Sequence, residues 1–92
     1  MKIVKDIKFT KSLERIILYI ADDSKTRARE FHTALRKNLR SIDNFPYKFR
    51  KSIYFNDEHI RDYIFMGYTI PYLIDKENDQ IVILDMFKWI EK

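Results

Sequence analysis

The sequence contains no cysteine, one glycine and two prolines among its 92 residues. Without cysteine, disulfides and thiolate metal sites are excluded. The two histidines, His32 and His59, lie far apart in the chain, so we expect no zinc site, and we expect no cofactor. No window approaches ~18 uninterrupted apolar residues, and the start MKIVKDIKF does not resemble a signal peptide. We therefore expect a cytoplasmic protein without membrane contact.

Hydrophobic residues make up 46% of the chain and aromatic residues 15%, which predicts a folded protein. At 92 residues we expect one domain that covers positions 1–92. The net charge of +4 is unevenly distributed: residues 1–51 carry a net charge of +8 and residues 52–92 a net charge of −4. The basic half indicates a polyanionic or acidic partner, although a solvated basic face without a ligand has the same pattern.

The first half of the chain predicts a strand followed by two helices. Apolar residues alternate over positions 2–9 as in a half-buried strand, and Thr10 is the expected N-cap of a helix that ends near Ala21. The capping residues of Asp22–Ser24 separate it from a second helix over about residues 25–42. The apolar stripe of the second helix comprises Ala28, Phe31, Leu35, Leu39 and Ile42. We expect the two helices to form an antiparallel hairpin.

The second half predicts strands. Alternating or apolar segments occupy positions 49–55, 60–66, 68–75 and 80–87. Gly67 is expected where a hairpin reverses, and Pro71 should be locally bulged or unpaired because it lacks an N–H group. The expected fold is therefore α+β: an N-terminal strand, an antiparallel helical hairpin and a four-stranded antiparallel meander, with the helices on one face of the sheet.

Three segments together resemble the ParE/RelE superfamily of bacterial type II toxins. They are LERIILYIADDSKTRAREFHTALRKNL, FPYKFRKS and IRDYIFMGYTIPYLIDKENDQIVILDMFKW. The resemblance covers nearly the whole chain and implies a small α+β toxin that a cognate antitoxin neutralises. It also implies one of two targets. RelE-like toxins cut messenger RNA in the ribosomal A site, whereas ParE-like toxins poison DNA gyrase.

Cutting RNA at the 2′-hydroxyl requires a base, an acid and cations that stabilise the charge developing on the phosphate. By position, Lys48, Arg50, Lys51 and Arg61 resemble the cationic cluster of the RNA-cutting toxins. If the chain is an endoribonuclease, these four residues are the expected catalytic set. The alternative is that they are ordinary solvent-facing strand residues, with both arginines paired to nearby carboxylates.

The carboxyl-terminal segment departs from the RNA-cutting branch. Members of that branch commonly carry a tyrosine or histidine there, whereas this chain has Phe87, Lys88 and Trp89. Phenylalanine cannot exchange a proton, and tryptophan only donates a hydrogen bond. His59 is expected to be a solvated turn residue. This departure favours a gyrase-directed toxin; ribosome-dependent RNA cleavage is the alternative, and a non-toxic nucleic-acid-binding module is a third possibility.

The second predicted helix carries an excess of cations. Arg36, Lys37 and Arg40 could contact phosphates, but contact with an acidic antitoxin helix explains them better. Trp89 is a further expected contact to the antitoxin or target. The expected partners are thus a cognate antitoxin and either gyrase or the ribosome with its message.

Overall fold

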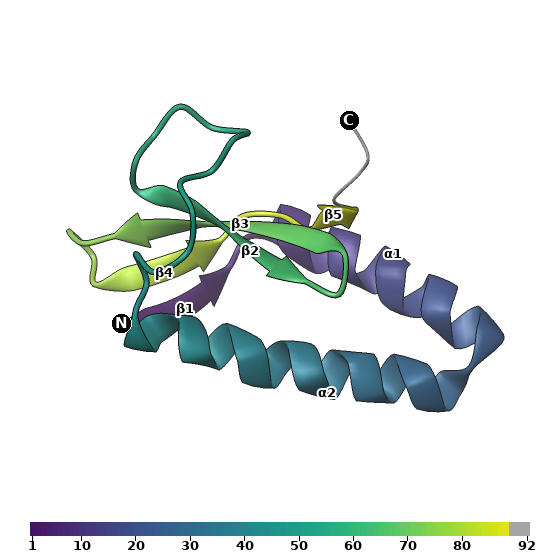
Figure 1. Cartoon of the computed structure of the whole chain (residues 1–92). Coiled ribbons are helices and arrows are strands. Elements are labelled where there is room, and N and C mark those ends of the chain that lie inside the picture. Colours follow the sequence, from purple (N-terminus) through teal and green to yellow (C-terminus); the bar gives the residue numbers. More distant parts are fainter. Residues whose placement is uncertain (89–92) are drawn as a thin grey trace.

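The computed structural model describes residues 1–88 and shows an α+β chain (Figure 1). Its elements are β1 (Lys2–Lys5), α1 (Ile7–Asp23), α2 (Lys25–Ser41), the 3₁₀ turn η1 (Ile42–Asn44), β2 (Ile60–Phe65), β3 (Tyr68–Asp75), β4 (Gln80–Ile83) and β5 (Phe87–Lys88). The two helices form a hairpin, as the sequence predicts: in Figure 1, α2 runs beneath the sheet and α1 lies behind it and to the right.

The first strand is shorter than predicted, and the first helix begins earlier. The Asp6 carboxylate accepts a hydrogen bond from the Lys8 N–H at 2.8 Å and so caps α1. The predicted N-cap at Thr10 is therefore wrong, because Thr10 lies inside the helix and its own N–H bonds to the Asp6 carbonyl. This shift places Phe9 on the helix, where it is fully buried.

The predicted break between the helices is confirmed at Ser24. Its N–H donates to the Ile20 carbonyl at 2.9 Å, which ends α1, and its hydroxyl accepts from the Arg27 N–H at 3.1 Å, which begins α2. The predicted stripe of α2 is also confirmed, since all of its members are buried: Ala28, Phe31, Leu35, Leu39 and Ile42. Phe31 packs edge-on against Phe65 and Tyr68 at the β2–β3 hairpin, which joins the helices to the sheet.

The described strands form a mixed sheet in the order β1-β4-β3-β2, with β5 paired to β3. β1 runs parallel to β4, whereas β2, β4 and β5 are antiparallel to β3. A parallel partner is possible because the helical hairpin carries the chain across between β1 and the later strands. The buried side chains of Ile70, Tyr72 and Ile74 in β3 pack with those of α2 in one core.

The strand predicted over positions 49–55 is wrong. Residues 45–59 form an irregular segment whose strand-type pairing with β2 is limited to an isolated bridge between Lys51 and Arg61. Two backbone N–H groups of this segment donate to side chains and not to a neighbouring strand. The Asp62 carboxylate accepts from the Ile53 N–H at 3.2 Å, and the Ser52 hydroxyl accepts from the Tyr54 N–H at 3.1 Å. Such local bonds compete with a ladder, so the chain leaves the sheet after Ser52.

The last predicted strand is split. β4 pairs with positions 72–75 of β3, and β5 pairs with positions 68–69. On the side of β4 and β5, Pro71 lies unpaired between these two ladders, and its carbonyl accepts from the Leu84 N–H at 2.9 Å. On the side of β2 the predicted bulge is wrong, because Pro71 pairs with Asp62 in an unbroken register. The reversal predicted at Gly67 is confirmed, since Met66 and Gly67 have φ values of 49° and 85° in the β2–β3 turn.

Candidate functional site

The four cations predicted from the sequence do not share one environment. The Arg50 guanidinium lies 3.2 Å from the Asp62 carboxylate, whose side chain has no exposed surface, while that of Arg50 is 40% exposed. Because Asp62 is a β2 residue next to Arg61, its side chain projects to the opposite face of the strand. Arg50 is thus drawn to that face and neutralises a buried carboxylate.

Arg61 has different partners. Its Nε donates to the Glu58 carbonyl at 3.1 Å, and its Nη1 donates to the Phe49 carbonyl at 3.2 Å. Lys51 lies opposite Arg61 in the isolated bridge and is exposed. The ammonium of Lys48 lies 5.5 Å from the centre of the Phe49 ring. The structure therefore brings Lys51 next to Arg61 and directs Arg50 to the other side of the strand.

Arg61 belongs to a cluster that the sequence did not reveal, which we call the Tyr47 cluster: Tyr47, His59, Arg61 and Lys76. The Tyr47 hydroxyl lies 2.7 Å from Nδ1 of His59. The centre of the Tyr47 ring is 4.9 Å from Cζ of Arg61 and 5.2 Å from Nζ of Lys76. These residues come from the irregular segment, β2 and the β3–β4 turn, so no spacing in the sequence marks them as neighbours.

A buried tyrosine anchors the segment that carries Tyr47. The Tyr72 hydroxyl donates to the Pro46 carbonyl, immediately before Tyr47. Burial raises the pKa of Tyr72 well above its usual value, and the charge of Asp62 adds to this, while nearby Arg61 opposes it. Tyr72 therefore remains a neutral hydrogen-bond donor across the physiological pH range and holds Tyr47 beside the sheet.

The cations predicted on the second helix are solvent-exposed. Arg36, Lys37 and Arg40 lie toward the carboxyl end of α2, and within residues 1–88 none of them is within 4.0 Å of a carboxylate. Trp89, the other predicted contact, lies outside the described residues. This end of α2 thus presents positive charge that an acidic partner could neutralise.

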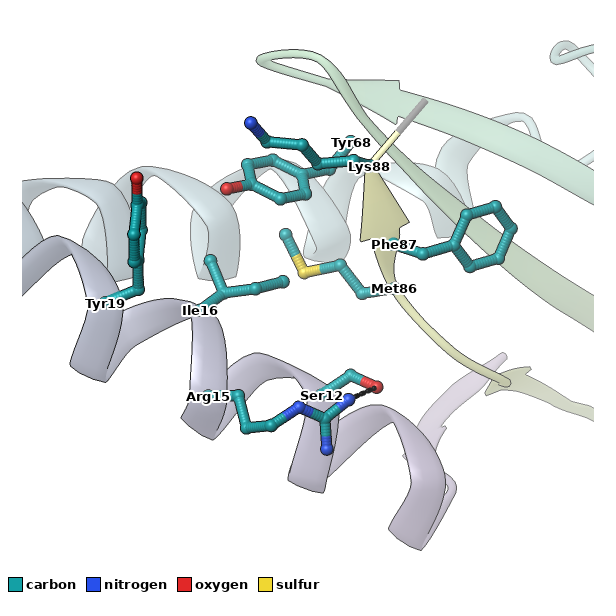
Figure 2. Close-up of a pocket in the computed structure, with 8 residues that line it drawn as sticks. All are labelled: Ser12, Arg15, Ile16, Tyr19, Tyr68, Met86, Phe87 and Lys88. Carbon is teal, nitrogen blue, oxygen red and sulfur yellow. Dashed lines mark hydrogen bonds between the residues drawn. The ribbon is translucent and has the colours of Figure 1, made fainter. Parts of the chain in front are cut away.

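Figure 2 shows a pocket of about 320 Å³ between α1 and β5. Ile16 and Met86 point toward one another at its centre, while the polar ends of Tyr19, Tyr68 and Lys88 lie around them. On the α1 side, the Ser12 hydroxyl donates to the Asp85 carboxylate at 2.8 Å. Among the described residues, the pocket has an apolar floor and a cationic rim, and its lining includes no carboxylate.

In the described part of the carboxyl-terminal segment, Phe87 and Lys88 lie in different surroundings. The Phe87 ring packs edge-on against Tyr54, with 5.0 Å between ring centres, and Lys88 is exposed. Within residues 1–88, no three histidine or acidic side chains are placed so that they could hold one metal ion. No helix in this part of the chain has the length and apolar character to cross a bilayer.

The comparison with family models identifies the chain. Residues 6–88 match the family described as "ParE toxin of type II toxin-antitoxin system, parDE". No curated protein matches the sequence. The match covers both helices and every described strand except β1, and the α+β order of elements agrees with the fold that the sequence resemblance implies. The chain therefore belongs to the ParE toxin family of type II toxin–antitoxin systems.

Proposed function

We propose that this toxin arrests growth by binding DNA gyrase and needs no catalytic group of its own. Its family makes it the toxin of a pair with a cognate antitoxin. Gyrase inhibition is the ParE-like branch of the two activities that the sequence resemblance implies. A cytoplasmic location, where gyrase and its DNA are found, is part of this proposal.

The observation that carries the proposal is the pairing of Arg50 with Asp62. An endoribonuclease of the RelE type would need Lys48, Arg50, Lys51 and Arg61 to converge on one phosphate. Here Arg50 instead neutralises a fully buried carboxylate. Arg50 thus has a structural partner on the opposite side of β2 from Arg61 and Lys51, which supports a binding mode over a cleavage mode.

The proposal is tested by measuring both activities with the same purified protein. We expect inhibition of gyrase supercoiling with accumulation of cleaved DNA, and no cleavage of messenger RNA in a reconstituted translation reaction. A matched pair of variants sharpens the comparison: Lys51→Ala removes an exposed cation near Arg61, and Lys11→Ala removes an exposed cation on α1. Cleavage in the A site that Lys51→Ala abolishes, together with unaffected gyrase, would replace our proposal by the RelE-like activity.

We also propose that the exposed cations of α2 contact the antitoxin. Arg36, Lys37 and Arg40 have no carboxylate partner within residues 1–88, and the acidic side chains of an antitoxin would supply one. Replacing all three by glutamate should weaken antitoxin binding and leave gyrase inhibition intact. Unchanged antitoxin affinity in that variant would show that these three cations of α2 do not contact the antitoxin.

A further inference from the structure

The Tyr47 cluster contains two cations, neither of which forms an ion pair with a carboxylate of residues 1–88. Arg61 and Lys76 both lie over the Tyr47 ring, so their charges are no more than about 10 Å apart. Within residues 1–88, neither is within 4.0 Å of a carboxylate, although Lys76 is flanked by Asp75 and Glu77 in the sequence. Two such charges repel each other within a Debye length of roughly 8–10 Å, and a bound anion would relieve that repulsion.

Arg61 is already held in place for such a ligand. Its bonds to the Glu58 and Phe49 carbonyls fix the guanidinium through Nε and Nη1. These bonds use only part of the five N–H donors of an arginine. Since the side chain is ordered before binding, less conformational entropy is lost when the remaining donors engage an anion. A guanidinium is also well suited to contact two oxygens of one phosphate.

The Tyr47–His59 pair adds a neutral donor in either arrangement of its shared proton. If the Tyr47 hydroxyl donates to Nδ1, the Nε2–H of the neutral imidazole is free to donate elsewhere. If Nδ1–H donates to the Tyr47 oxygen, the phenolic O–H is free instead. The pair therefore always presents one unused donor beside the two cations.

The surface next to Tyr47 has room for more than a single ion. A hollow of about 550 Å³ is lined by Asn44, Phe45, Pro46, Tyr47 and Lys48. Phe45 is 70% exposed, and such a ring provides a face on which a nucleobase can stack. An anion site beside an exposed aromatic ring and a further lysine matches a phosphate with its attached nucleoside better than a free ion.

We propose that the Tyr47 cluster binds a phosphate group of a nucleic-acid strand, with the adjacent base stacked on Phe45. Arg61 and Lys76 supply the positive charge, and the Tyr47–His59 pair supplies the neutral donor. The net charge of the whole chain, +4, favours the approach of such a polyanion. This activity goes beyond gyrase binding and does not depend on it.

The test is fluorescence anisotropy with a labelled single-stranded oligodeoxynucleotide at several salt concentrations. Lys76→Gln should weaken binding several-fold and lower the slope of log affinity against log salt by about 0.7, the value for one lost phosphate contact on a single strand. Phe45→Ala should weaken binding roughly 10-fold with the slope unchanged, because stacking is uncharged. The matched control is Lys11→Gln, an exposed lysine of α1 outside the cluster, which should bind like the wild type.

Two further ligands identify the source of the phosphate. An oligonucleotide of the same sequence with an uncharged methylphosphonate backbone should not bind, and inorganic phosphate at the same concentration of phosphate groups should not displace the labelled strand. The proposal is overturned if the wild type does not bind the strand, or if Lys11→Gln and Lys76→Gln weaken binding equally. Displacement by inorganic phosphate at equal concentration would make the free ion the ligand and would also overturn it.

Discussion

Replacing Arg50 by alanine should destabilise the fold, and this effect can be estimated from the structure. The variant leaves the Asp62 carboxylate buried with the Ile53 N–H as its remaining hydrogen-bond donor, while its Oδ1 has no partner within residues 1–88. Removing one partner of a buried ion pair costs about 3–5 kcal/mol, and a hydrogen bond to a charged group contributes about 1.5–3 kcal/mol. Because Arg50 is 40% exposed, water can enter the vacated space, and we expect a loss of about 2–3 kcal/mol in the free energy of unfolding.

Thermal unfolding followed by circular dichroism measures this loss. For a domain of this size, each kcal/mol shifts Tm by about 4–8 °C, so Arg50→Ala should lower Tm by roughly 10–20 °C. Lys51→Ala removes a neighbouring exposed cation and should stay within about 0.5 kcal/mol of the wild type. Adding Asp62→Asn to Arg50→Ala should recover part of the stability, since an amide needs no cation.

An Arg50→Ala variant as stable as Lys51→Ala would refute the structural role of Arg50. That result would also make Arg50 available again as a phosphate-binding residue. If the predicted loss is found, reduced toxicity of an Arg50 variant reflects unfolding and says nothing about catalysis. Toxicity should then be compared at a temperature well below the Tm of the variant.

Three further outcomes follow from the fold. Phe31→Ala removes a ring packed against two aromatic partners, so the free energy of unfolding measured in urea should fall by about 3–5 kcal/mol. A loss of ~0.5 kcal/mol or less would show that the contact between Phe31 and the β2–β3 hairpin is loosely packed. Gly67→Ala should cost roughly 1 kcal/mol or more, because its φ of 85° strains an alanine although no atom lies within 4 Å of the added carbon; an unchanged midpoint would contradict this. The pKa of Asp75 is lowered by hydrogen bonds from Asn78, so its stabilising contribution is present above the usual aspartate pKa and is lost as pH falls through the folded-state value. Asn78→Ala should move the carboxyl titration of Asp75, followed by NMR, upward, and an unmoved titration would show that the Asn78 bonds are not formed in solution.

Local signals in the sequence were sufficient to predict the helical hairpin and the β2–β3 turn. The stripe of α2 repeats at helical spacing, Ser24 is a capping residue, and Gly67 permits the positive φ of the turn. Each of these features depends on neighbouring residues alone, so composition and spacing predict it. The start of α1 was misplaced because Asp6 is also a capping residue and lies four positions before Thr10.

The features that the sequence did not predict depend on contacts between residues far apart in the chain. Positions 49–55 alternate like a strand, but the Asp62 side chain takes the Ile53 N–H from nine residues away. The parallel pairing of β1 with β4 likewise joins the two ends of the chain. The Tyr47 cluster gathers residues from three separate segments, so the sequence predicts His59 correctly as an exposed turn residue but not its contact with Tyr47. The candidate site could be predicted only in part, through Arg61.

The most direct test of the proposed function is a gyrase supercoiling reaction to which the purified toxin is added in increasing amounts. We predict that supercoiling falls and that linear DNA accumulates, and that prior addition of the cognate antitoxin prevents both effects. Undisturbed supercoiling at concentrations that stop growth in cells would contradict a gyrase-directed toxin.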